Sequence, residues 1–184
     1  MTQNLVTRFA PSPTGRLHLG HAWSAVQAHH LARGANGRFL LRIEDIDQTR
    51  CRPEFENGIY DDLRWLGLDW DGDVWVQSQR TTHYDAALAS LIERGLAYRC
   101  WCTRAEIAAS AGAPQGDEGP IYPGRCKGRT SPDDDRPHCW RLDVAKAMAL
   151  TGPLHWHDAV AGAVAARPDA QGDVVIARKD AATS

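Results

Sequence analysis

The residues from Asn4 to Gly34, NLVTRFAPSPTGRLHLGHAWSAVQAHHLARG, constrain the fold of this chain more than any other segment. The segment opens with a run typical of a short β-strand, which ends at Pro11. A loop rich in proline and glycine follows, and helical spacing then continues to Gly34. The segment therefore predicts a strand, a loop and a helix in immediate succession.

Two further segments extend this pattern. In GRFLLRIEDID, Phe39, Leu41 and Ile43 fall on one face of an extended chain, which predicts a second strand. Residues 80–98, RTTHYDAALASLIERGLAY, have helical spacing, and Gly95 predicts the end of that helix. Strands that alternate with helices are typical of a parallel sheet, so we expect an α/β fold.

The pattern changes after Cys102. Thr103 and Glu106 have the spacing of a capping box, which predicts a short helix. Residues 112–137 have the composition of a loop, and we interpret them as part of an insert. Strand-like runs return at 138–144 and 173–178.

Composition limits the classes of protein to which the chain can belong. Its 21 basic and 23 acidic residues leave a formal net charge of −2, so a nucleic-acid partner would have to be bound by a local surface. No run reaches the roughly 18 apolar residues of a membrane span, and the chain does not open with a charged and then apolar leader. We therefore expect a cytoplasmic protein with no membrane partner.

The loop between the first strand and the first helix has the residues of an anion site. In a doubly wound sheet this turn lies at the carboxyl ends of the strands, where helix amides attract phosphate. Gly15 and Gly20 allow close approach of a ligand, and His18 and His21, three residues apart, can donate hydrogen bonds to one anion. A tight turn with two surface histidines is the alternative.

Cysteine spacing favours a metal site over a disulfide framework. Five cysteines are present, and Cys100 and Cys102 are separated by one residue in CWC. With Cys126 in YPGRC they offer three soft ligands for a tetrahedral zinc, which could hold together a loop with little core. Reduced cysteines without a metal are the alternative, and we interpret Cys51 and Cys139 as ordinary thiols.

Three motifs resemble one enzyme family. PSPTGRLHLGH resembles the HIGH signature of class I aminoacyl-tRNA synthetases, and RFAPSPTG with RIEDID resembles their glutamyl branch. WVQSQR follows in a similar place. Within that branch the chain is most similar to the glutamyl-queuosine tRNA(Asp) synthetases, which attach glutamate to a modified anticodon base. The resemblance implies a Rossmann-like parallel sheet with a zinc-binding insert.

The resemblance also implies roles for residues around the loop. Arg8 would bind a substrate carboxylate and Glu44 the ammonium of glutamate, although the two could instead form a structural ion pair. The residues implied to complete the glutamate pocket are Phe9, Ala10, Pro11 and Ser12. His18 and His21 would contact the ATP phosphates as catalytic residues, with Gly20 against the adenine. We favour capping or exposure over a magnesium site for Asp45 and Asp47.

The implied partners are L-glutamate, ATP with Mg²⁺, and tRNA(Asp) that bears queuosine. A structural Zn²⁺ would be held by Cys100, Cys102, Tyr122 and Cys126. The tyrosine four residues before the last cysteine is typical of the glutamyl-queuosine enzymes. Some full-length glutamyl-tRNA synthetases have a histidine two residues after that cysteine, where Gly128 stands here. His138 or Cys139 could compete as the fourth ligand.

We expect a nucleotide- and glutamate-binding half over 1–99, the zinc insert over 100–138, and a truncated return to the catalytic domain over 139–184. None of the three lysines, Lys127, Lys146 and Lys179, has the serine-flanked setting of the family's second ATP signature. We therefore expect these residues alone to be inactive. The alternatives are the amino-terminal part of a discriminating glutamyl-tRNA synthetase, and a catalytically silent zinc-containing fragment that binds tRNA or nucleotide.

Overall fold

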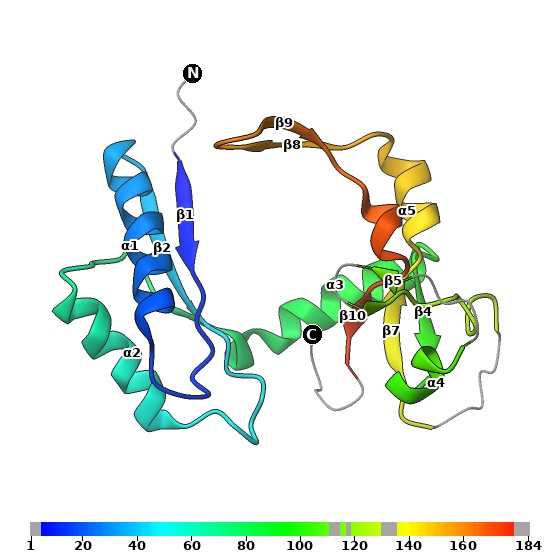
Figure 1. The fold of residues 1–184 in the computed structure, drawn as a ribbon. Helices are drawn as coiled ribbons and strands as arrows, with labels where there is room; N and C mark the ends of the chain where they lie inside the picture. The colour runs from blue at the N-terminus through cyan, green and yellow to red at the C-terminus, as the bar shows by residue number, and fades with distance from the viewer. Residues whose placement is uncertain (1–4, 111–114, 117–118, 130–135, 179–184) are drawn as a thin grey trace. The chain divides into compact units, whose positions relative to one another are not determined.

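The computed structural model describes residues 5–110, 115–116, 119–129 and 136–178, which form two compact units, 1–81 and 82–184 (Figure 1). The elements of the first unit are β1 (Val6–Phe9), α1 (Leu19–Gly34), β2 (Arg38–Ile43), α2 (Pro53–Trp65), β3 (Trp75–Val76) and the 3₁₀ helix η1 (Gln77–Arg80). No helix among the described residues is long and apolar enough to cross a membrane.

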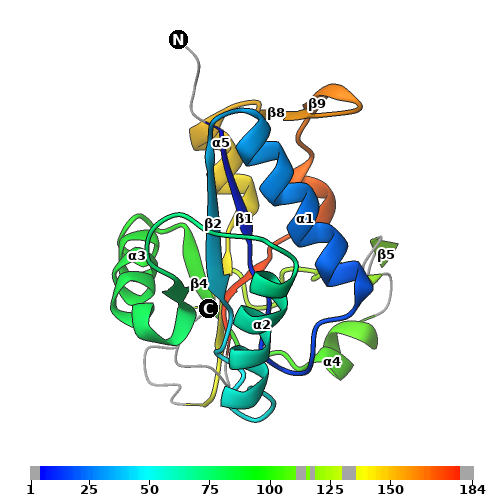
Figure 2. The ribbon, with the colours of Figure 1, turned by 90° about the vertical axis from the view of Figure 1, so that its left-hand side faces the viewer.

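The first unit contains the predicted parallel sheet, in the order β1-β2-β3. Helices α1 and α2 lie on the same side of this sheet (Figures 1 and 2). The alternation of β2 is confirmed, because Phe39, Leu41 and Ile43 are buried against the helices. The residues that complete this core are Phe9, Ala25, Ala32, Ile59, Leu63 and Leu68.

Local sequence explains where α1 ends. The helix runs to Gly34, and the amide of Gly37 then donates to the carbonyl of Ala32 at 2.8 Å. A Cβ at Gly37 would collide with the backbone carbonyl of Leu5. Glycine therefore lets the backbone at Leu5 approach the start of β2 closely, while Asn36, with a φ of 50°, makes the turn itself.

Helix α2 was not predicted from the sequence, although its ends carry helix signals. Pro53 occupies the first turn with two glutamates, and Arg64 lies in the last turn, which suits the helix dipole. The tryptophans at positions 65, 70 and 75 differ in their burial. Trp65 is 85% exposed at the end of α2, and Trp75 is 48% exposed beneath the guanidinium of Arg80. Trp70 does pack against the core.

The second unit is built around an antiparallel sheet in the order β10-β7-β4. Its elements are α3 (Thr81–Glu93), β4 (Ala97–Cys100), α4 (Arg104–Ala108), β5 (Gln115–Gly116), β6 (Gly119–Pro120), β7 (Cys139–Leu142), α5 (Val144–Thr151), β8 (His155–Asp158), β9 (Gly162–Ala165), the 3₁₀ helix η2 (Pro168–Gln171) and β10 (Val175–Ala177). β8 and β9 form a separate hairpin, and β5 pairs with β6.

The strands predicted at 138–144 and 173–178 are confirmed as β7 and β10, which pair with each other, and β7 also pairs with β4. The division at 81/82 lies before the expected boundary at 99, because β4 pairs with β7 inside the second unit. The capping box that begins α4 is confirmed: Glu106 N donates to Thr103 Oγ1 at 3.1 Å, and Thr103 N donates to Glu106 Oε2 at 2.7 Å.

Candidate functional site

The loop between β1 and α1 is held by the segment that follows β2. The amide of Glu44 donates to the carbonyl of Pro11, and the amide of Arg52 donates to the carbonyl of Pro13, both at 3.0 Å. Pro13 is fully buried beneath the loop. Two prolines and two long-range hydrogen bonds therefore fix the loop at the carboxyl end of the parallel sheet.

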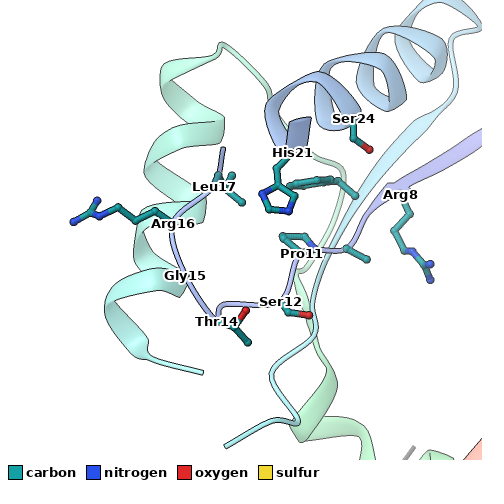
Figure 3. Close-up of a pocket in the computed structure, with 11 residues that line it drawn as sticks. Arg8, Pro11, Ser12, Thr14, Gly15, Arg16, Leu17, His21 and Ser24 are labelled. Carbon is teal, nitrogen blue, oxygen red and sulfur yellow. The ribbon is translucent and has the colours of Figure 1, made fainter. Parts of the chain in front are cut away.

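This loop encloses a cavity of about 520 Å³ (Figure 3). The lining residues are Arg8, Phe9, Ala10, Pro11, Ser12, Thr14, Gly15, Arg16, Leu17, His21 and Ser24. In Figure 3 the ring of His21 projects from α1 toward Pro11, and Arg8 lies on the β1 side. Of the residues expected to bind glutamate or ATP, His21 and the run from Arg8 to Ser12 line this cavity. His18, Gly20 and Glu44 do not line it.

Four lining residues escaped the sequence analysis: Thr14, Arg16, Leu17 and Ser24. Three of them belong to the same strand-to-helix loop, so their place in the PSPTGRLHLGH segment is the signal that could have found them. Ser24 lies three residues after His21, on the adjacent turn of α1.

His18 and His21 build the first turn of α1. His18 is the N-cap, and its Nδ1 accepts the amide hydrogen of Gly20 at 3.1 Å. The amide of His18 in turn donates to Nδ1 of His21 at 3.3 Å, and the two rings stack with centroids 3.7 Å apart. A Cβ on Gly20 would lie only 3.1 Å from the His18 ring, so a side chain at this position would require that ring to shift by a few tenths of an ångström.

These hydrogen bonds assign the protons of the two rings. Because both Nδ1 atoms accept, each neutral ring carries its hydrogen on Nε2 and can donate it to a ligand. Burial and the neighbouring His18 lower the pKa of His21 below its usual value, which favours the neutral form. The helix dipole adds positive potential at the same place, so this turn is suited to bind an anion such as phosphate.

Arg8 and Glu44 do not form the alternative ion pair. Among the described residues, the ion pair of Glu44 is with Arg42, whose Nε lies 3.4 Å from Glu44 Oε1. Arg8 is exposed and lines the cavity. The charge of Arg8 is therefore placed to meet an anionic ligand, whereas Glu44 lies beside Pro11 without reaching the cavity wall.

Asp45 and Asp47 form hydrogen bonds within the fold, but neither is the N-cap residue of a helix, because Val76 precedes η1 and Arg52 precedes α2. Asp45 accepts hydrogen bonds from the amide and hydroxyl of Ser78, at 2.8 and 2.5 Å. Asp47 accepts from Thr49 Oγ1 at 2.6 Å and Arg50 Nε at 2.7 Å, and these bonds lower its pKa to about 2. Asp45 thus joins the end of β2 to the turn after β3.

The predicted metal ligands gather in the second unit. The sulfur atoms of Cys100, Cys102 and Cys126 lie within 4.8 Å of one another, and no other group of three or more His, Cys, Asp and Glu ligand atoms among the described residues is this close. The Sγ atoms of Cys102 and Cys126 are 3.6 Å apart, and the hydroxyl of Tyr122 lies 4.0 Å from Cys102 Sγ. Zn–S bonds of about 2.3 Å in a tetrahedron give S···S distances of about 3.8 Å, so the thiols fit zinc.

The chemistry of the cluster also suits a cation. Burial alone would raise the pKa of Cys126, but hydrogen bonds from Tyr122 and from the Trp101 backbone lower it to about 7. Cys126 therefore becomes a thiolate, which is the form that binds metal, more readily than an ordinary cysteine. Burial and the hydrogen bond with Cys126 instead raise the pKa of Cys102 to about 11, and burial raises the pKa of Tyr122, so these two groups would lose their protons as the metal binds. The proposed competitors for the fourth ligand, His138 and Cys139, lie outside the cluster in the described structure.

Two of the clustered cysteines, Cys100 and Cys126, also belong to a buried core of the second unit. The buried side chains of this core are Cys100, Tyr122, Cys126 and Cys139. Three thiols and a tyrosine bury little apolar surface, so a bound metal would supply cross-links that hydrophobic packing does not.

Two of the three lysines, neither of which has the setting of the second ATP signature, form ion pairs or hydrogen bonds within the fold. Lys127 Nζ lies 2.7 Å from Asp143 Oδ1 and 3.2 Å from Asp173 Oδ2. Lys146 Nζ donates to the carbonyl of Gly95 at 3.2 Å. Lys179 lies outside the described residues.

Comparisons with known proteins agree with this arrangement. Glutamyl-Q tRNA(Asp) synthetase of Rhodobacter capsulatus is 50% identical over 98% of this chain, which covers 69% of that relative. Glutamate–tRNA ligase of Synechococcus sp. WH7803 is 40% identical over 94% of this chain, which covers 37% of it. A glutamate tRNA ligase from Elizabethkingia meningosepticum, solved with its amino acid, has a TM-score of 0.73 and 25% identity over 99% of this chain and 40% of that one.

The model of the family described as tRNA synthetases class I (E and Q), catalytic domain, matches residues 4–183. This match includes both the loop around His18 and the cysteine cluster of the second unit. The chain therefore belongs to the class I tRNA synthetases of the glutamate and glutamine group.

Proposed function

We propose that this chain belongs to an enzyme that activates glutamate with ATP and transfers it to the queuosine base of tRNA(Asp). The observation that carries the proposal beyond the family is Tyr122, whose hydroxyl lies 4.0 Å from Cys102 Sγ and accepts a hydrogen bond from the Cys126 amide. A tyrosine at this position is typical of the glutamyl-queuosine enzymes that the sequence resembles. The 50% identical relative from Rhodobacter capsulatus bears that name, which supports the same choice.

Glutamate binding follows from the charge of the cavity. Arg8 would pair with a carboxylate of the substrate, and the hydroxyl of Ser12 and the backbone at Ala10 would line the pocket. Glu44 would receive the ammonium from its place beside Pro11, where Arg42 is its ion-pair partner.

Activation needs positioning and charge stabilisation more than a nucleophilic side chain. The glutamate carboxylate attacks the α-phosphate of ATP, pyrophosphate leaves, and glutamyl-adenylate forms. Negative charge on the phosphate oxygens would be met by Nε2–H donors of His18 and His21 at the start of α1. A hydroxyl of the queuosine ring then attacks the activated carbonyl and releases AMP.

Two metal ions belong to this proposal. Mg²⁺ would accompany ATP and neutralise part of the phosphate charge. Zn²⁺ would be held by Cys100, Cys102, Tyr122 and Cys126, and would close the insert around the core of the second unit.

A second candidate is glutamylation of the terminal adenosine of tRNA. The 40% identical Synechococcus relative is named a glutamate–tRNA ligase, and this observation favours that candidate. Gly128, at the place where the sequence analysis expects a histidine ligand in some such enzymes, argues against it.

The decisive experiment maps the glutamyl group on the tRNA. The chain, and a longer form that also carries the family's second ATP signature, are each incubated with ATP, Mg²⁺ and labelled glutamate, together with tRNA(Asp) that bears queuosine, tRNA(Asp) without queuosine, or tRNA(Glu). From the longer form we expect label only on the queuosine-bearing tRNA, in the anticodon fragment after nuclease digestion and mass spectrometry. Label on a terminal adenosine would support the second candidate, and binding of nucleotide or tRNA without any product would support a catalytically silent fragment.

A further inference from the structure

Arg141 is a buried cation whose charge is not offset by a carboxylate in the described part of the chain. The residue is only 8% exposed, and its Nη1 donates to the backbone carbonyl of Asp173 at 2.6 Å. Its Nε is buried and has no hydrogen-bond partner among the described residues. A buried guanidinium destabilises the fold unless another group stabilises its charge, so a group other than a carboxylate must do so for Arg141.

The partner of the guanidinium is the ring of Tyr122. The central carbon of Arg141 lies 3.9 Å from the centroid of that ring, which is the geometry of a cation–π contact. Strand β7 places Cys139 and Arg141 on one buried face, and Cys139 is paired with Cys100 across the sheet. Arg141 therefore lies on the side of the sheet that carries the cysteine cluster.

The anchor of Arg141 is itself firmly held. Asp173 accepts hydrogen bonds from Tyr98 Oη at 2.6 Å and from the amide of Val144 at 2.9 Å, and it pairs with Lys127. The carbonyl that receives Arg141 is thus part of a rigid network. A planar guanidinium fixed at one edge can hold an aromatic ring in one orientation.

We propose that Arg141 is a positioning residue of the metal site, which holds the Tyr122 oxygen beside Cys102 and Cys126 and offsets the charge of the ligands. Three thiolates and a phenolate around Zn²⁺ leave an excess of negative charge, and Arg141 is the nearby cation that faces the phenol ring. This inference rests on the metal site of the proposed function.

A double-mutant cycle on the full chain tests it. Zinc affinity is measured by competition with a chromophoric chelator, and Co²⁺ absorption spectra report the ligand geometry, for wild type, Arg141→Met, Tyr122→Phe and the double variant. Arg99→Met is the matched control, because Arg99 lies on β4 with its guanidinium 5.5 Å from the ring of Trp140. Arg141→Lys, which keeps the charge without the planar stack, replaces the methionine variant if that variant does not fold.

We expect Arg141→Met to weaken zinc binding by about 10- to 100-fold and to alter the Co²⁺ spectrum, as changes to groups behind metal ligands do. In the Tyr122→Phe background, where the ring remains but the oxygen is absent, Arg141→Met should have little further effect on zinc affinity. Arg99→Met should bind zinc as tightly as wild type. An equal loss in both backgrounds, or no loss in either, overturns the inference. If wild type binds zinc weakly or not at all, the metal site itself is refuted, and this inference with it.

Discussion

Replacement of Lys127 by methionine tests whether the ammonium of Lys127 joins the insert to the sheet. Lys127 bridges two carboxylates, and the side chain of Asp143 is only 4% exposed and that of Asp173 only 10%. Both oxygens contact one Nζ, at 2.7 and 3.2 Å, so they lie no more than about 6 Å from each other. At an effective dielectric constant of about 20 their repulsion would be about 3 kcal/mol once the cation is removed.

Solvent reduces this figure, because the side chain of Lys127 is 38% exposed. We therefore expect Lys127→Met to lower the free energy of unfolding of the second unit by about 2–3 kcal/mol at pH 7. The matched control is Lys146→Met, since Nζ of Lys146 is 3.8 Å from Asp143 and its side chain is 64% exposed. That variant should cost less than about 1 kcal/mol.

The effect should depend on pH in a defined direction. Burial would raise the pKa of Asp143, but Lys127 and the amide of Lys146 outweigh burial and lower it. The stabilisation from Asp143 is therefore present above the pKa of the unfolded chain, about 3.9, and is lost as the pH falls through the lower folded value. The difference between wild type and Lys127→Met should accordingly narrow below about pH 4.

Hydrogen exchange in increasing urea, followed by mass spectrometry, measures this effect for each unit separately. Peptides from α1 provide an internal reference, because both partners of Lys127 lie in the second unit. A loss of less than about 0.5 kcal/mol that does not change with pH would refute the reasoning, since it would mean that the two carboxylates are not held as a buried ionised pair.

Three further predictions concern the two sites. Arg8→Ala should weaken glutamate binding, measured by calorimetry, by at least tenfold, which corresponds to about 1.5–3 kcal/mol. Arg38→Ala, at the other end of the sheet, should leave the affinity unchanged. Equal affinities of wild type and Arg8→Ala for glutamate would show that Arg8 does not bind the substrate. Cys102→Ser should abolish stoichiometric zinc in the purified chain and leave exchange protection in α1 intact, whereas retained zinc would exclude this ligand set. NMR titration should give His21 a pKa below 6.5 that rises in His18→Asn. Because the folded pKa lies below that of the unfolded chain, the contribution of His21 to the stability of the fold is present above pH 6.5 and is lost as the pH falls through the folded value. An unshifted pKa would contradict the stacked pair of rings.

Much of the first unit was predictable because its signals are local. The alternation of Phe39, Leu41 and Ile43 specifies which face of β2 is buried. In the second unit, the capping box of Thr103 was predictable for the same reason, because it requires only residues within one helical turn. Helix α2 was missed although its proline and charges were visible, and Trp65 shows that a large aromatic residue at a helix end need not be buried.

What the sequence by itself determined is therefore the strand–loop–helix unit, the residue types around His18 and His21, and the cysteine spacing, because each depends on neighbours along the chain. The tertiary structure alone decided that Glu44 pairs with Arg42 and that Arg141 covers the ring of Tyr122. These contacts depend on which strands pair and on which side chains meet across the folded chain. Spacing along a sequence does not specify such long-range partners, because loop closure and packing select among several alternatives of similar local chemistry.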